Sequence, residues 1–195
     1  MFCKNFACAL VIIALASIAC LQPAWSGEME DGGRAVYQNN QKAVVTVQLV
    51  IQQKFSSPSM GSQENEEKSE VTGMIIDPSG LTVVSLFRTD PSSLYEKMMS
   101  GMDESKIEIN VDSAKYLMDD GTEVPATVVL RDKDLDLAFL MPKTKPEQPM
   151  TAIDLTQTAT PLILDPIVAL VRLGKAADRV CSATLERVQA VIEKP

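Results

Sequence analysis

The sequence predicts an all-β protein, a small sandwich or barrel, on three observations. An early segment alternates apolar and polar side chains over twelve residues, Lys42–Gln53. Two later segments contain the turn signals Pro78-Ser79-Gly80 and Asp119-Asp120-Gly121. Between Ala43 and Met141, six strand candidates follow one another with at most one helix. Short strands separated by turn signals are typical of small β-sandwiches and β-barrels.

The first strand candidate is Lys42–Gln53, in which the apolar residues fall on one face. The residues of that face are Ala43, Val45, Val47, Leu49 and Ile51. This alternation predicts a half-buried strand. The following segment, Ser56–Glu70, is rich in Ser, Gly and Glu, and we interpret it as a solvated loop.

Val71–Asp77 and Leu81–Leu86 are predicted to form a β-hairpin. In its turn, Pro78 fixes φ at a value that the turn favours, and Gly80 ends the turn without steric cost. The next segment, Asp90–Met102, is predicted to contain a short helix that Asp90 or Ser92 could cap.

Ile107–Met118 and Glu123–Arg131 form the second predicted hairpin, with an Asp-Gly turn signal between them. Pro125 lies in the returning strand and predicts an edge or a bulge there. The last strand of this region is Leu135–Met141, with Leu135 and the alternate residues after it on one face. Asp136 begins its other face.

Beyond Met141 the sequence predicts a Pro-spaced linker and two further strands, Ile163–Leu173 and Ala183–Glu193, separated by Gly174–Arg179. The predicted organisation is a signal peptide at 1–26, a flexible lead-in at 27–42, a barrel at 43–141, a linker at 142–162 and a partial second barrel, a β-hairpin, at 163–195.

The N-terminus is predicted to be a secretory signal. Lys4 precedes the apolar run Ala7–Leu21, which is short for a spanning helix, and Ala24-Trp25-Ser26 offers small residues for a signal peptidase. A cut after Ser26 sends the protein to the periplasm or the exterior and leaves no transmembrane segment. The alternative is a lipoprotein anchored through Cys20.

Composition excludes several function classes. The chain has no histidine, so it offers no imidazole base for a nucleophile and no histidine ligand for a metal. With 26 acidic and 18 basic residues, its formal net charge is −8, which argues against nucleic-acid binding. Removal of the signal leaves Cys181 as the one cysteine, which excludes an intrachain disulfide and is best interpreted as a small packed side chain.

Other chemistry finds little support in the sequence. Lys97, Lys106 and Lys115 could in principle act as bases, but none stands in a Ser-x-x-Lys arrangement with supporting motifs. The methionines of 98–102 are interpreted as packing residues and not as a soft-metal site, because neither Cys nor His accompanies them. No metal and no cofactor is therefore predicted.

The order of these motifs resembles the trypsin-like (chymotrypsin-fold) serine proteases, and most nearly their bacterial high-temperature-requirement branch. Gly73–Leu81 resembles the hairpin before the catalytic histidine, and Ala114–Leu140 resembles the next block, with its Asp-Gly turn and its strand Asp136–Leu140. Asp165–Leu170 and Ser182–Val191 resemble the strands that open the second barrel. The resemblance implies a closed six-stranded first barrel and only the first hairpin of an incomplete second barrel.

The functional residues of that family are only partly matched. Phe87 occupies the expected position of the histidine, and Asp136 matches the triad aspartate. The serine nucleophile belongs to a part of the second barrel that has no counterpart here. Because the aspartate only orients the base, the resemblance implies a non-catalytic relative in which Asp136 is a relict. The alternative is that Asp136 is an ordinary residue at the start of a strand.

These observations predict a non-catalytic binding module of the cell envelope. The strands Ile163–Leu173 and Ala183–Glu193 would have unpaired edges, which could pair with a protein, a peptide or a second copy of the chain. The alternative is a truncated fragment or remnant of a serine endopeptidase. Peptidase activity is not expected, because a general base is absent.

Overall fold

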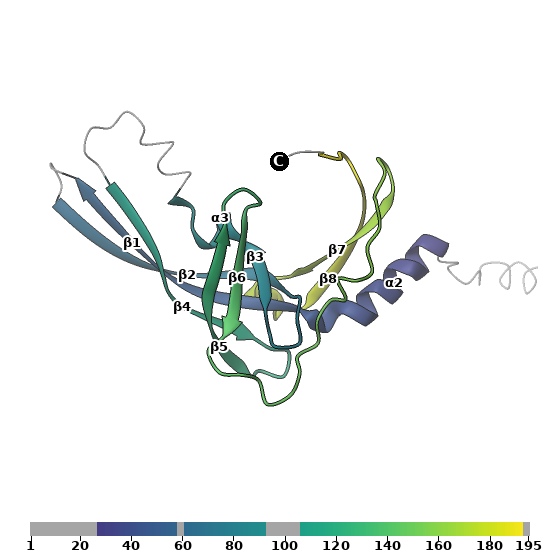
Figure 1. Ribbon diagram of the computed structural model, residues 1–195, viewed down its shortest axis with the longest axis horizontal. Helices are drawn as coiled ribbons and strands as arrows, with labels where there is room; N and C mark the ends of the chain where they lie inside the picture. Colours follow the sequence, from purple (N-terminus) through teal and green to yellow (C-terminus); the bar gives the residue numbers. More distant parts are fainter. Residues whose placement is uncertain (1–26, 58–60, 93–105, 193–195) are drawn as a thin grey trace, which may run out of the picture. The chain divides into compact units, whose positions relative to one another are not determined.

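The computed structural model describes residues 27–57, 61–92 and 106–192 (Figure 1). The helical segments are α2 (Glu28–Asn40), η1 (Gln41–Ala43), α3 (Leu86–Thr89) and η2 (Lys175–Ala177). The strands are β1 (Val44–Ser57), β2 (Gly61–Ile75), β3 (Thr82–Ser85), β4 (Lys106–Leu117), β5 (Glu123–Asp132), β6 (Leu137–Pro142), β7 (Pro166–Arg172) and β8 (Cys181–Arg187).

Six of these strands form a closed antiparallel barrel in the order β1-β2-β3-β6-β5-β4, and β7 and β8 form a separate two-stranded sheet. The predicted all-β fold is therefore confirmed, including the six strands of the barrel and the separate hairpin. In the hairpin, Pro166 lies opposite Arg187 and Arg172 lies opposite Cys181. Closure gives each barrel strand two neighbours along at least part of its length.

The barrel core confirms the face predicted for the first strand. Its residues Ala43, Val45, Val47, Leu49 and Ile51 are each at most 4% exposed. Tyr116 of β4 is fully buried among them, and its hydroxyl donates to the carbonyl oxygen of Gly80 at 3.1 Å. Gly73 must be glycine, because a Cβ there would lie 2.7 Å from Val47 and 2.8 Å from Thr82.

The loop predicted at Ser56–Glu70 is wrong, because β2 begins at Gly61. The strand pairs with β1 from Gly61 to Met74 without a break in register, and the distal part of β1 also pairs with β4 (Figure 1). Its residues 61–68 are exposed, so burial does not explain the strand. Backbone pairing with β1 explains it, and cross-strand contacts such as Lys54–Glu64 add to that pairing.

Both predicted turns are confirmed. The amide of Gly80 donates to the carbonyl oxygen of Asp77 at 2.9 Å, and Gly80 has a φ of +92°. The amide of Gly121 donates to Met118 at 3.0 Å, and Gly121 has a φ of +83°. These positive φ values explain why both turns contain glycine.

Two details of β5 and β6 differ from the prediction. The bulge in β5 lies between Val128 and Leu130 and not at Pro125, which pairs with Lys115 and lies one residue outside the ladder with β6. In β6, the residues that face the core are Ala138 and Leu140, not the alternate set that begins at Leu135. Both faces of this strand are apolar, so alternation alone did not identify the inner one.

The predicted flexible lead-in contains the helix α2, whose first turn carries three carboxylates, Glu28, Glu30 and Asp31. Negative charge at this end of a helix is favourable. Of the predicted helix at Asp90–Met102, residues 93–102 lie outside the described residues. The amide of Ser92 donates to the Asp90 carboxylate at 3.2 Å, which is a local turn contact.

The segment between β6 and β7, which was predicted to be a linker, contains no strand. Hydrogen bonds nevertheless attach it to the barrel. The amides of Met150 and Ile153 donate to the carbonyl oxygens of Pro78 and Ile75, each at 2.9 Å. Met150 and Ala152 also pack against the barrel core. The linker is therefore a packed part of the fold.

Candidate functional site: the corner at Phe87 and Asp136

The two predicted site residues lie side by side at the corner where β3 leads into α3. The backbone N–H of Phe87 donates to Oδ1 of Asp136 at 2.8 Å. The hydroxyl of Ser85 donates to Oδ2 of the same carboxylate at 2.9 Å. The fold thus brings together residues 49 positions apart in the sequence, and each oxygen of the Asp136 carboxylate accepts a hydrogen bond.

A tight turn before β6 places Asp136. The Asp132 carboxylate accepts hydrogen bonds from the amides of Asp134 and Leu135, each at 3.0 Å, and folds the chain back. Asp136 then adopts a φ of +57°, which aspartate tolerates better than most residues. Its carbonyl oxygen accepts the amide of Leu86 at 2.8 Å, so backbone and side chain both hold the corner.

The corner holds no side chain that could act as a base beside the Asp136 carboxylate, among the residues that contact it. The phenyl ring of Phe87 has no atom that accepts a proton, and the residue is 45% exposed. Ser85, which was not among the predicted site residues, uses its hydroxyl to donate a hydrogen bond to the Asp136 carboxylate. The described contacts orient Asp136, but they provide no imidazole for it to orient.

Cys181 is a buried free thiol, as the packing interpretation predicted. Burial raises the pKa of the thiol above its usual value, which lowers its thiolate fraction. Since the thiolate is the nucleophile, Cys181 is poorly suited to covalent chemistry.

Of the three lysines considered as bases, Lys115 is the one whose side chain the structure describes, and it is paired away from this corner. Nζ of Lys115 lies 2.7 Å from the Glu123 carboxylate, and its side chain is 33% exposed. An ion-paired lysine open to solvent is not the desolvated amine that base catalysis requires. Lys97 and the methionines of 98–102 lie outside the described residues, as does the side chain of Lys106.

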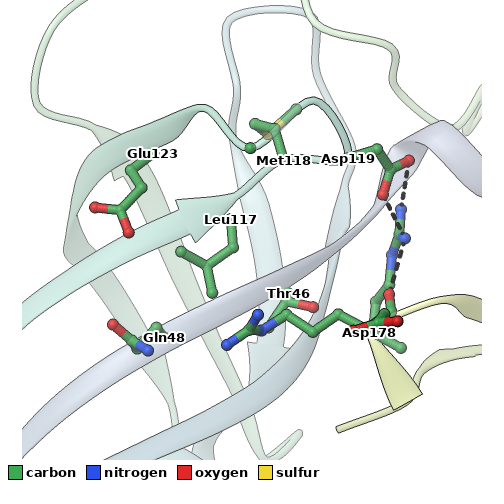
Figure 2. Close-up of a pocket in the computed structure, with 10 residues that line it drawn as sticks. Thr46, Gln48, Leu117, Met118, Asp119, Glu123 and Asp178 are labelled. Carbon is green, nitrogen blue, oxygen red and sulfur yellow. Dashed lines mark hydrogen bonds and ion pairs between the residues drawn. The ribbon is translucent and has the colours of Figure 1, made fainter. Parts of the chain in front are cut away.

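A second site is a polar pocket of about 310 Å³ that is lined by residues of the barrel and of the hairpin (Figure 2). It is lined by Thr46, Gln48, Leu117, Met118, Asp119, Gly121, Glu123, Arg172, Asp178 and Arg179. None of these residues was predicted to belong to a site. The only signal in the sequence is that Arg172 ends an otherwise apolar strand, β7.

Arg172 is the central residue of this pocket, and its side chain is only 7% exposed. Its guanidinium makes two hydrogen bonds with the Asp119 carboxylate, at 2.6 and 3.1 Å (Figure 2). It also donates to three backbone carbonyl oxygens, those of Gln41, Val44 and Arg179, at 3.2, 2.6 and 3.1 Å. Five N–H groups therefore meet five acceptors, which satisfies this buried guanidinium.

Arg179 makes a second link between hairpin and barrel. Its guanidinium binds both oxygens of the Glu70 carboxylate, at 2.6 and 3.0 Å. The hydrogen bond from Arg179 is the main cause that lowers the pKa of Glu70 below its usual value. The two arginines of the pocket are thus already paired, which suits a structural joint better than a site for a charged ligand.

Comparison with known proteins adds no family. No protein-family model matches the chain, and no curated protein matches it. Within the described residues, no helix is long and apolar enough to cross a membrane. The fold itself defines the class: a closed six-stranded antiparallel β-barrel with an appended β-hairpin.

Proposed function

We propose that the protein is a catalytically inactive relative of the trypsin-like serine proteases that serves as a binding module of the cell envelope. The observation that carries this proposal is the contact between Asp136 and the backbone N–H of Phe87 at 2.8 Å. The resemblance requires such a contact between the triad aspartate and the position of the histidine. Here that position holds a side chain that cannot accept a proton.

The inactivity follows from the chemistry of the triad. A serine hydroxyl becomes a useful nucleophile when a neighbouring base takes its proton, and the aspartate acts only through that base. The chain contains no histidine at any position. A relative that has kept the aspartate and the corner but not the base keeps the scaffold without its reaction.

Binding is supported by the hairpin. Among the described residues, β7 and β8 pair only with each other, so each has a second edge with no partner strand. Ile167 and Val171 are 40% and 42% exposed on β7. Unpaired strand edges with apolar side chains favour strand addition by a protein, a peptide or a second copy of the chain. The predicted signal at 1–26 supports an envelope or secreted location.

Inactivity is tested with a fluorophosphonate probe and a casein-cleavage assay on the purified protein. We expect neither labelling nor cleavage. Labelling at any serine would overturn the proposal. The alternative, a remnant of a serine endopeptidase, is tested in the coding DNA beyond Pro195, where an in-frame Gly-x-Ser-Gly segment would favour it.

The relation to the protease corner is tested by Phe87→His. Because the wild-type chain lacks histidine, the introduced imidazole gives the only histidine signal in an NMR titration. We expect the Asp136 carboxylate to raise its pKa above the ordinary value of about 6.5. Asp136→Asn in the same background should remove that rise. A pKa that is indifferent to Asp136 would contradict the proposed kinship.

Hairpin binding is tested by sedimentation velocity and by variants with a charge on the hairpin. Ile167→Lys should weaken any self-association or peptide capture, because it places a charge on an exposed apolar position of β7. Val129→Lys is the matched control, since Val129 is similarly exposed but lies on the barrel. Equal behaviour of the two variants would count against the hairpin as the binding surface.

A further inference from the structure

In the described part of the chain, the outer edge of β2 has no partner strand over much of its length. β2 pairs with β1 from Gly61 to Met74, but it pairs with β3 only at Met74 and Ile75. Among the described residues, no strand pairs with the opposite edge of β2 between Gly61 and Gly73. Residues 61–68 are exposed, so described side chains do not cover this stretch.

The backbone groups that face this edge can be assigned from one hydrogen bond. The amide of Ile76 donates to Leu81 at 2.8 Å, so the backbone of Ile76 faces the β3 side. Alternate residues of a strand face the same side, and the β1–β2 register has no bulge. The residues whose N–H and C=O face the open edge are therefore Ser62, Glu64, Glu66, Lys68 and Glu70. The backbone of Ile75, an odd-numbered residue, faces the opposite edge of β2, the β1 side. In agreement, its carbonyl oxygen accepts a hydrogen bond from the amide of Ile153.

The side chains along this edge are mainly acidic. Glu64 contacts Lys54 only loosely, at 3.5 Å between largely exposed side chains, and Glu66 is also exposed. Glu70, at the inner end of the edge, is bound to Arg179. Two copies pairing through this edge would bring glutamates close together, which is unfavourable. A strand with Lys or Arg at alternate positions would instead place opposite charges across from Glu64 and Glu66.

We propose that the edge Ser62–Glu70 binds an extended basic peptide segment by β-strand addition. The open N–H and C=O groups supply the backbone ladder, and Glu64 and Glu66 select alternate basic side chains. Lys68 disfavours a third basic residue and so limits the register. This site is separate from the hairpin and from the corner at Asp136, and it does not depend on the proposed function.

The test uses the full chain and nine-residue fluorescent Thr peptides that carry Lys at two alternate central positions. We expect an increase in fluorescence anisotropy with the Lys peptide and none with a peptide in which Glu replaces Lys. The double variant E64Q/E66Q should weaken binding about fivefold or more, by the loss of two cross-strand charge pairs. D134N/E147Q, which removes two acidic side chains away from this edge, should leave binding unchanged.

Backbone pairing is separated from simple charge attraction by N-methylated Lys peptides, which leave the protein unaltered. Methylation of the amides on one edge of the peptide should abolish binding, and methylation on its other edge should be tolerated. Equal binding of the two methylated peptides would overturn strand addition. Failure of the Lys peptide to bind would also overturn the proposal. So would a dimer of the protein whose stability depends on Glu64 and Glu66, because the edge would then bind a second copy of the chain.

Discussion

The barrel and the β7–β8 hairpin are both antiparallel β-structures, but different forces hold them. The barrel encloses fully buried residues such as Leu49, Tyr116 and Leu140. The hairpin contributes only Cys181 to the buried apolar residues and exposes Ile167, Val171 and Leu185. Its described polar links to the rest of the fold converge on Arg172 and Arg179. A closed sheet can bury its own apolar face, whereas two strands alone cannot.

Substitutions in the barrel and in the hairpin should therefore have different consequences. In the barrel, removal of a side chain opens a cavity in a shared core, so the whole domain should lose stability. In the hairpin, removal of an anchor should release two strands while the barrel stays folded. The comparison therefore predicts global effects in one region and local effects in the other.

The largest expected effect is that of Leu49→Ala in the barrel. Leu49 is fully buried, and truncation of such a residue costs about 2–5 kcal/mol in the free energy of unfolding. Urea denaturation followed by circular dichroism measures it. Leu185→Ala on the hairpin is the matched control, because this leucine is 43% exposed and its truncation should cost less than about 1 kcal/mol. Equal losses of unfolding free energy in the two variants would contradict the claim that the barrel core, and not the hairpin, determines stability.

Next in size is Arg172→Met, which removes the buried anchor of the hairpin. Loss of its hydrogen bonds to Asp119 and to three backbone carbonyl oxygens should cost about 3 kcal/mol, on the scale of bonds to charged groups. Hydrogen exchange should show faster exchange in β7 and β8 with little change in the barrel. Arg131→Met, at an exposed arginine of β5, is the control. Uniformly faster exchange would show that the hairpin and barrel unfold as one unit.

The predictable part of this fold is the part with local signals. The alternation around Val45 and Val47 and the glycine turn at Gly80 identify strands from neighbouring residues alone. The strand that begins at Gly61 has no such signal, because it depends on backbone pairing with β1. The positions of Phe87 and Asp136 were expected only through a resemblance. Arg172 could not be recognised as an anchor, since its acceptors come from distant segments.

A smaller effect is expected for Tyr116→Phe, which keeps the volume of the core and removes one hydroxyl. The lost hydrogen bond to Gly80 should cost about 1 kcal/mol. Burial raises the pKa of Tyr116 from 10.0 to about 12. The neutral phenol is therefore favoured in the folded state, and its contribution is present below pH 10 and lost as the pH rises towards 12.

The alkaline titration of Tyr116 is measured by tyrosinate absorbance and by urea denaturation at a series of pH values. The difference in absorbance between wild type and Tyr116→Phe isolates this residue. Wild-type stability should fall more steeply than that of the variant between pH 10 and 12. Parallel declines would show that Tyr116 is not responsible.

The smallest effect concerns the second anchor, the pair Glu70–Arg179. The two side chains are 22% and 29% exposed, so solvent weakens their attraction, and a double-mutant cycle with E70Q and R179Q should give about 0.5–1 kcal/mol. The more exposed pair Lys54–Glu64, at 3.5 Å, should give a coupling near zero in the same cycle. Because Arg179 lowers the pKa of Glu70 below 4.5, the coupling should persist above that pH and disappear as the pH falls through the lowered value. A coupling as large as the loss caused by Arg172→Met would mean that two anchors share the hairpin equally, whereas the burial of Arg172 favours one dominant anchor.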